Sequence, residues 1–186
     1  LGHLWSHVDG VAEARPGKNV CMFGSDGSQQ EGDDAEAARY AVARKLNLTL
    51  LLDDNDVTIA GHPTEYMQGY DLVRTLSGQG LQVQSCDGED LDALFLSIRQ
   101  AIVYQGPAAV VIRRKMAVGV PGIEGLPKGH DVIPVPLAID YLTAKGHTAA
   151  VAMLQQPGEK AAKVVWRGSS PEQAKNRDEF GKIISE

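Results

Sequence analysis

The stretch that decides the fold is MFGSDGSQQEGDDAEAARYAVARKLNLTLLLDDNDVTIAGHP, residues 22–63. Two apolar runs, 20–23 and 48–52, each stop abruptly at polar residues. Between them, small apolar residues recur at helical spacing over 37–46. Continuous apolar runs are typical of buried parallel strands, and parallel neighbours need a crossover connection such as a helix. The stretch therefore predicts a strand–helix–strand unit whose two strands lie side by side.

Polar side chains follow both predicted strands. Asp26 comes just after the first strand, and Asn55 comes just after the second. In α/β proteins, ligands bind at the carboxyl ends of parallel strands, so we expect the two side chains to meet there. A carboxylate, an amide oxygen and nearby backbone carbonyls suit a hard divalent cation, Mg²⁺ or Ca²⁺, and Mg²⁺ takes its other ligands from phosphate and water. The pattern favours a metal-bound diphosphate.

The rest of the chain continues the alternation of strands and helices. Gly and Pro residues separate the segments, and a Gly- and Pro-rich loop, 116–136, is longer than a simple connection needs. The prediction is an α/β fold of three α/β/α layers around a mainly parallel sheet, with residues 1–155 as one domain. Further strands are expected at 81–84 and 108–112, and further helices at 1–15, 70–76, 91–105 and, broken at Gly146, 137–154.

Composition excludes several classes of protein. The 186 residues are 43% hydrophobic and carry a net charge of −6, with 24 Asp and Glu against 18 Lys and Arg. This balance argues against a nucleic-acid or anionic-membrane partner. Two cysteines give no disulfide framework, and no apolar run approaches the roughly 20 residues of a membrane span. We expect a cytoplasmic protein.

Other phosphate-binding or hydrolytic motifs do not fit. A Walker loop requires a Lys after its last Gly, and a dinucleotide fingerprint would not place Asp26 against a pyrophosphate without a cation. No Gly-x-Ser-x-Gly nucleophile elbow is present. His62, in the loop after Asn55, either serves the predicted site or is a solvated loop residue.

Several residues of the deciding stretch match a known motif in order, and through them residues 1–145 resemble the thiamine diphosphate-binding domain of transketolases. The resemblance implies thiamine diphosphate with a divalent metal as cofactors, and a fold that binds the pyrophosphate at the edge of the sheet. The matching residues are Asp26, Gly27, Glu31, Gly32, Glu36, Asp53, Asp54, Asn55, Thr58 and Gly61.

The resemblance also implies roles for individual residues. The metal ligands would be Asp26, Asn55 and the backbone carbonyl of Val57. Ser25 and Gly27 would lie at the diphosphate, with the Gly27 N–H as a donor. The segment 1–12 fits a Leu-Gly-x-Gly-x-Ser pattern except that Leu4 replaces the second Gly, and Leu1 would touch the thiazolium ring.

The long loop after the fourth strand contributes two further candidates by the same resemblance. Val118 would make a hydrophobic contact to the cofactor, and His130 would help to hold diphosphate or substrate as the catalytic histidine. Two of the departures from the family pattern fall at predicted site positions. Ser25 stands where the family has Gly, and Ile133 stands at the family's His position, so His130 would substitute from three residues earlier.

The resemblance extends to substrates and partners. It implies transfer of a two-carbon ketol unit between sugar phosphates, and a homodimer formed through the helix that carries Glu31 and Glu36. Residues 156–175 resemble a linker, and 176–186 resemble the start of the pyrimidine-binding domain. Since the catalytic Glu of that domain is missing, we expect the fragment alone to be inactive.

Two alternatives remain open. The same motif serves the E1 components of 2-oxoacid dehydrogenases and the deoxyxylulose-phosphate synthases, although the Thr58-Ile59-x-Gly61 sequence favours transketolase. An alternative of another class is a non-catalytic binding or assembly module in which the changes at Ser25 and Ile133 have removed activity.

Overall fold

A four-stranded parallel sheet forms the centre of the protein, which we describe from a computed structural model over residues 3–156. The order of the strands is β1-β2-β4-β3, and every neighbouring pair is parallel. The predicted strand–helix–strand unit and the mainly parallel sheet are therefore confirmed. The strands are β1 (Val20–Ser25), β2 (Leu48–Asp54), β3 (Gln82–Asp87) and β4 (Ala108–Arg113).

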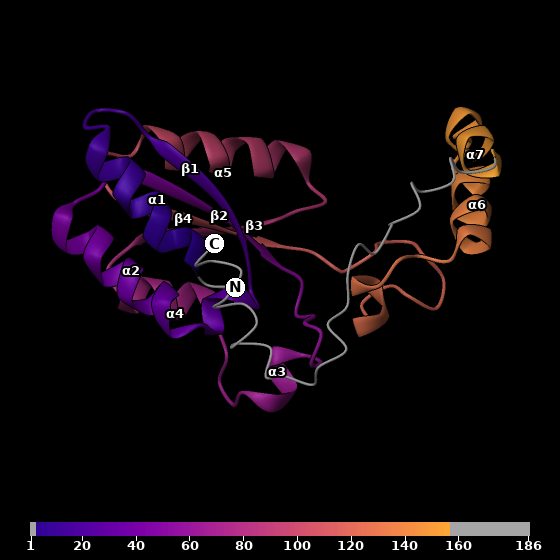
Figure 1. Ribbon diagram of the computed structural model, residues 1–186, viewed down its shortest axis with the longest axis horizontal. Coiled ribbons are helices and arrows are strands. Elements are labelled where there is room, and N and C mark those ends of the chain that lie inside the picture. The colour runs from indigo at the N-terminus through magenta and orange to yellow at the C-terminus, as the bar shows by residue number, and fades with distance from the viewer. Residues whose placement is uncertain (1–2, 157–186) are drawn as a thin grey trace, which may run out of the picture.

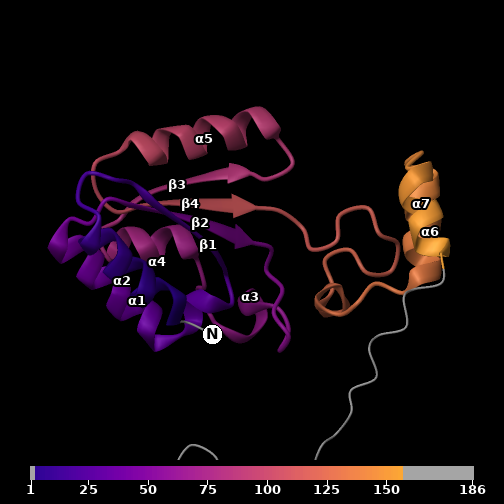
Figure 2. The ribbon, with the colours of Figure 1, turned by 45° about the horizontal axis from the view of Figure 1, so that its top comes forward.

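Helices cover both faces of the sheet, which makes the three predicted layers (Figures 1 and 2). Helices α1, α2 and α4 pack on one face, and α5 packs on the other. A one-turn helix, α3, lies beyond the carboxyl ends of the strands. The helices are α1 (His3–Ala14), α2 (Gly32–Arg44), α3 (Pro63–Tyr66), α4 (Leu72–Gly78), α5 (Leu91–Val103), α6 (Val135–Ala144) and α7 (Thr148–Gln155), with short 3₁₀ turns at Ser28–Gln30 and Pro127–His130.

The register brings the ends of three strands level. Ser25 at the end of β1 pairs with Asp53 of β2, and Asp53 pairs in turn with Ile112 of β4. The next residue of β2, Asp54, pairs with Arg113. Polar and charged residues of β1, β2 and β4 are thus collected at one edge, as the sequence predicts.

The two faces of the sheet are covered unequally. On the α1–α2–α4 face, small residues such as Ala38 and Ala41 let α2 approach the strands, and the core there is large. On the other face, α5 buries only Ala101 completely, and it leaves Phe95 and Leu96 exposed. The spacing of apolar residues over 91–105 predicts that Leu91 and Ile102 face the core, but this is wrong, because Leu91 is 75% exposed and Ile102 is also exposed.

A similar correction applies to α1. The pattern predicts Leu4 and Val11 on the buried face with Val8 and Ala12, but Leu4 and Val11 are exposed. The buried side of the helix is rotated toward Trp5, whose indole ring fills the space against the sheet.

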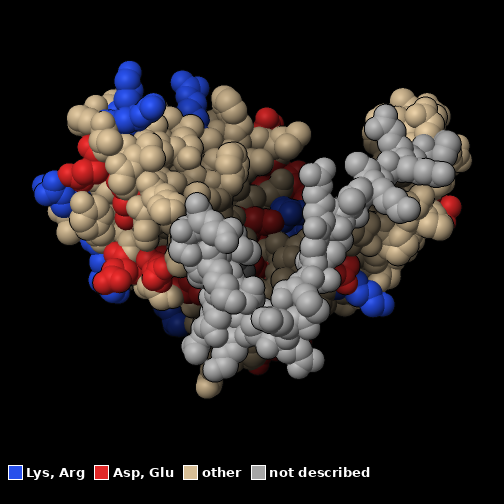
Figure 3. Space-filling model, in the orientation of Figure 1, with Lys and Arg blue, Asp and Glu red and all other residues tan. Residues whose placement is uncertain are grey.

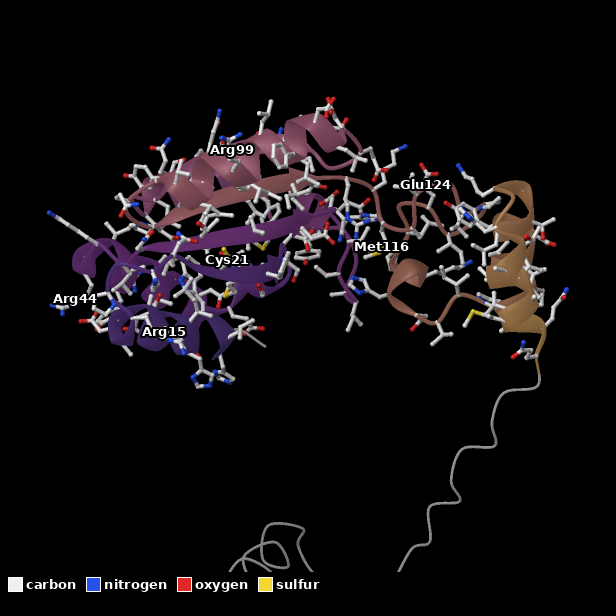
Figure 4. All side chains as sticks on the ribbon, turned by 90° about the horizontal axis from the view of Figure 1, so that it is seen from above. Arg15, Cys21, Arg44, Arg99, Met116 and Glu124 are labelled. Atoms are coloured by element: carbon white, nitrogen blue, oxygen red, sulfur yellow. The ribbon has the colours of Figure 1, made fainter. Side chains whose placement is uncertain are left out.

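The chain after β4 leaves the sheet. A loop that includes Met116 and Glu124 leads from the carboxyl edge to α6 and α7, which stand apart from the sheet in every view (Figures 1, 2 and 4). These two helices are separated at Gly146, which has a φ of 76°, so the predicted break there is confirmed. Among residues 3–156, no helix combines the length and apolarity needed to cross a membrane. Leu1, the predicted linker from residue 157 onward and the predicted start of a second domain lie outside the described residues.

We predict that Asp34→Asn changes stability in a pH-dependent way. Asp34 on α2 is 2% exposed and accepts a hydrogen bond from Gln29 Nε2 at 2.8 Å. Burial raises its pKa from 3.8 to about 6, with the charges of Glu31 and Asp33 adding to the rise. The folded state therefore holds this proton more tightly than the unfolded state, so the stability that Asp34 contributes falls as the pH rises from about 4 to 6.

Urea unfolding from pH 3.5 to 8 checks this prediction. Above pH 6 the Asn variant is expected to be more stable than the parent by up to about 2 kcal/mol, and near pH 3.5 the difference vanishes. A variant that is less stable at pH 8 would mean that the ionised carboxylate stabilises the fold through Gln29.

Candidate functional site

Asp26 is fixed in place by the end of β1. Its N–H donates to the carbonyl of Asp53 at 2.9 Å, which extends the β1–β2 ladder by one residue. Its own carbonyl accepts from the Tyr70 hydroxyl at 3.2 Å. Burial, followed by the charges of Asp26 and Asp54, raises the pKa of Tyr70, which keeps this hydroxyl protonated as a donor. The side chain of Asp26 thus projects from a rigid backbone at the sheet edge.

The Asp26 carboxylate is buried with one oxygen unsatisfied. Oδ1 accepts the N–H of Gly27 at 2.7 Å, whereas Oδ2 is buried and accepts no hydrogen bond of good geometry from the described residues, although the N–H groups of Asn55 and Asp56 lie near the carboxylate. Burial raises the pKa of Asp26, while the N–H groups of Gly27 and Asp56 act in the opposite direction. An orphaned carboxylate oxygen of this kind is costly unless a cation or donor binds it.

Asn55 lies beside Asp26 with its amide held in one orientation. Its Nδ2 donates to Asp53 Oδ2 at 3.1 Å, and its Oδ1 accepts from the Val57 N–H at 2.9 Å. Asp26, Asn55 and Val57 are all buried. Asp26 and Asn55 thus lie at the same carboxyl edge, and Val57 is joined to the Asn55 amide.

An arginine that the sequence analysis did not single out holds this arrangement. Arg114 donates from Nε and from one terminal nitrogen to the two oxygens of Asp53, at 2.8 and 2.9 Å. Asp53 in turn accepts from Asn55, so a chain of side chains runs from Arg114 on the β4 side to the amide of Asn55. The only sequence signal was the basic triplet 113–115, which does not reveal the partner of each residue.

The loop after Asn55 is braced by Asp56. This residue has a φ of 55°, and its carboxylate accepts from the N–H and hydroxyl of Thr64 at 3.0 and 2.7 Å. Its carbonyl accepts from His62 Nδ1 at 2.8 Å. His62 is therefore a structured loop residue that faces the site.

A groove of about 550 Å³ opens at this edge between the β2 loop, α4 and the loop after β4. Asn55, His62 and Tyr70 line it, as do Arg113 and Arg114, whereas Asp26 does not. Figure 4 shows Met116 and Glu124 of the β4 loop beside this edge.

Acidic side chains line the groove beside the basic triplet 113–115. Asp54, Asp56 and Asp71 line it, together with Asn55. Burial, reinforced by the charge of Asp26, raises the pKa of Asp54 to about 6. A bound cation would offset the repulsion between the negative charges of Asp54 and Asp26.

The structure places the remaining candidates as follows. His130 reaches the site, because its Nε2 lies 2.8 Å from the carbonyl oxygen of Val57. Ser25 forms a turn with Ser28, whose hydroxyl donates to the Ser25 carbonyl at 2.9 Å. Val118 is not brought to Asp26, since it lines a neighbouring groove with Cys86.

Two backbone groups have partners other than those the resemblance implies. The N–H of Gly27, expected at a diphosphate, donates to Asp26. The carbonyl of Val57, expected at a metal, accepts from the His130 ring, although a carbonyl oxygen has a second lone pair.

Comparisons with known proteins agree with this geometry. Residues 14–144 match the family described as transketolase, thiamine diphosphate binding domain. A transketolase family protein of Sinorhizobium fredii is 33% identical over 137 residues, which are 70% of this chain and 49% of that protein. One subunit of the apulose-4-phosphate transketolase of Actinobacillus succinogenes is 27% identical, over 67% of this chain and 47% of that protein. The chain thus spans about half the length of these two relatives.

Solved structures share the fold. The transketolase of Campylobacter jejuni superposes with a TM-score of 0.64 at 24% identity, over 69% of this chain and 21% of that one. A Pichia stipitis transketolase in complex with sedoheptulose 7-phosphate gives 0.64 at 22% identity, over 78% and 23% of the two chains. Together with the match over residues 14–144, the strand order and the polar sheet edge, this places the chain in the transketolase family, as a thiamine diphosphate-binding domain.

Proposed function

We propose that this chain holds thiamine diphosphate together with Mg²⁺, or Ca²⁺, as the cofactor-binding part of a transketolase-type transferase that moves a two-carbon ketol unit between sugar phosphates. The observation that carries the proposal is the buried Oδ2 of Asp26, which lacks a hydrogen-bond partner among the described residues. A carboxylate in this position needs a positive charge. When bound, the cofactor would supply the reactive carbon that accepts the ketol unit.

The donor set fits a hard cation. Asp26 offers a carboxylate oxygen, Asn55 an amide oxygen and Val57 a carbonyl, which are the ligand types that Mg²⁺ and Ca²⁺ select. Over residues 3–156, no three His, Cys, Asp or Glu side chains converge as a metal cluster. The proposed site therefore relies on one charged protein ligand, and diphosphate oxygens and water would complete the shell.

The chain's own residues would prepare the site in three ways. Tyr70 and the β1–β2 ladder fix the backbone of Asp26. Asp53, held by Arg114, accepts from Nδ2 of Asn55 and so fixes the orientation in which Oδ1 accepts from the Val57 N–H. His130 brings the long loop over the edge, where it would exclude water and stand near the diphosphate or substrate.

The proposed partners are a sugar phosphate and a second polypeptide of the same kind. The exposed acids Glu31 and Glu36 on and beside α2 support an interface there. The relative from Actinobacillus is named as one subunit of its enzyme, which supports a need for further polypeptide to complete the site. The contact of His130 with Val57 favours a working site over the degenerate module considered from the sequence, because it supplies a histidine despite Ile133.

We predict that Asp26→Ala abolishes metal-dependent binding of thiamine diphosphate. Isothermal titration calorimetry with Mg²⁺ and with EDTA measures this directly. Asp26→Asn keeps the shape of the side chain but removes the charge, and it should weaken binding by at least about tenfold, which corresponds to about 1.4 kcal/mol.

The matched control is Asp87→Ala. Asp87 ends β3 at the opposite edge of the sheet from β1, is exposed, and its side chain accepts locally from the Glu89 N–H at 2.9 Å. It should leave binding unchanged. If Asp26→Ala binds the cofactor as tightly as the parent, the metal assignment fails.

A second prediction concerns Arg114→Gln. Removing the guanidinium frees Asp53 and lets the Asn55 amide rotate. Substitution of residues that hold metal ligands in place typically lowers metal affinity 10–100-fold. We expect the apparent Kd for Mg²⁺ at fixed thiamine diphosphate to rise by about tenfold in calorimetry.

The control for this change is Arg113→Gln. Arg113 loses the same charge but makes only a 3.9 Å contact to Asp54 and is exposed. Equal losses in the two variants would show that net charge matters and that the orientation of Asn55 does not.

A further inference from the structure

Helix α5 exposes a mostly apolar face to solvent. Phe95 is 62% exposed and Val103 is 66% exposed, and Leu91, Leu96 and Ile102 are exposed as well. Over the region where Figure 1 shows α5, uncharged atoms predominate in the space-filling view (Figure 3). Single exposed apolar side chains are normal, but several of them gathered on one helix mark an interaction surface.

Two opposite charges lie in the middle of this face. Since successive residues of a helix are about 100° apart, the side of α5 opposite the buried Ala101 carries both charges within an arc of about 100°. The residues on this arc are Asp92, Phe95, Leu96, Arg99 and Val103. Figure 4 shows Arg99 on α5, on the side away from the sheet. No ion pair among residues 3–156 includes Asp92 or Arg99, so both charges are available to an external partner.

The spacing of these four central residues makes the face complementary to itself. Asp92 comes three residues before Phe95, and Arg99 comes three residues after Leu96. If two copies of α5 pack antiparallel about a two-fold axis between positions 95 and 96, Asp92 of each copy lies opposite Arg99 of the other. Phe95 of each copy then packs against Leu96 of the other. A parallel arrangement would instead place like charges opposite each other.

We propose that the exposed face of α5 binds a second copy of this chain in an antiparallel, two-fold symmetric contact, with an apolar centre at Phe95 and Leu96 and an Asp92–Arg99 ion pair on either side. The antiparallel arrangement also sets the two helix dipoles in their favourable relative orientation. The contact lies on the opposite face of the sheet from α2, and it does not rest on the bound cofactor.

An anionic membrane surface is a poorer match for this face. Helices that lie on such surfaces carry several Lys and Arg residues beside their apolar side. On α5, the exposed acid Asp92 lies beside Arg99, and the whole chain has a net charge of −6. A partner that offers one cation and one anion at matching positions fits better, and a second copy of α5 offers both.

The length of α5 sets the expected strength of the contact. The helix has 13 residues, so it is about 20 Å long. A contact between one such helix and its copy lies at the small end of specific interfaces, and we therefore expect a dimer with a Kd in the micromolar range or weaker. Sedimentation equilibrium of the full chain, without cofactor and at concentrations up to about 1 mM, measures this association.

Reversal of single charges is the decisive experiment. Arg99→Asp places two acids opposite each other, and Asp92→Arg places two bases opposite each other, so each variant alone should dimerise at least about tenfold more weakly than the parent. An equimolar mixture of the two variants should associate again, because every contact then joins an acid of one copy to a base of the other. The double variant, which carries both reversals, should also dimerise, because the ion pairs are restored with their signs exchanged.

Two further variants separate the contact from effects of net charge and of folding. Arg15→Asp makes the same change of charge at an exposed residue beyond the end of α1, and it should leave the Kd unchanged. Phe95→Ser alters an exposed residue at the centre of the contact and should raise the Kd at least about tenfold without a change in net charge. Circular dichroism checks that each variant is folded.

The proposal is overturned if the parent stays monomeric up to the highest concentration, or if Arg99→Asp changes the association no more than Arg15→Asp. It is also overturned if the mixed variants associate no better than either alone. A chain ending at Gln156 that dimerises while the full chain does not would show that residues 157–186 occupy the face instead. Association through α2 would not respond to the α5 variants, so failure of either interface is recognised separately.

Discussion

The parallel pairing of β1 with β2 is the constraint on which the rest of the structure depends. The ladder continues past the last residue of β1 through the bond between the Asp26 N–H and the Asp53 carbonyl. Through that bond, a buried carboxylate is placed beside the amide of Asn55. Slipping the register by one residue would turn Asp26 to the other face of the sheet and separate the two side chains. The polar edge is thus a consequence of strand pairing and not of loop flexibility.

Buried negative charge is the second theme of the molecule. Asp9, Asp26 and Asp34 are all nearly inaccessible, and burial raises the pKa of each. Asp34 has an internal donor in Gln29, and Asp9 lies beside the indole of Trp5 one turn earlier. Asp26 at the sheet edge keeps one oxygen without a donor among the described residues.

Much of the fold and part of the site could be predicted from the sequence. Continuous apolar runs identify β2 and β4, because strands buried on both faces leave no polar positions to confuse the pattern. The buried face of α5 could not be predicted in this way. Apolar residues such as Leu91 lie on its exposed side, so the periodicity does not identify the face that packs against the sheet. The positions of Asp26 and Asn55 could be predicted from the ends of the strands. The two hydrogen bonds from Arg114 to Asp53 could not, since a contact across 61 residues leaves no local signature in the sequence.

The contact between His130 and Val57 bridges 73 residues of sequence with one hydrogen bond. Such a bond contributes about 1 kcal/mol, which is less than the entropy lost by ordering a glycine-rich segment of this length. The hydrogen bond alone therefore does not account for the order of the segment, in which Val120 and Ile123 are also buried. Burial of apolar side chains and one imidazole together fix where this segment lies relative to the strand ends.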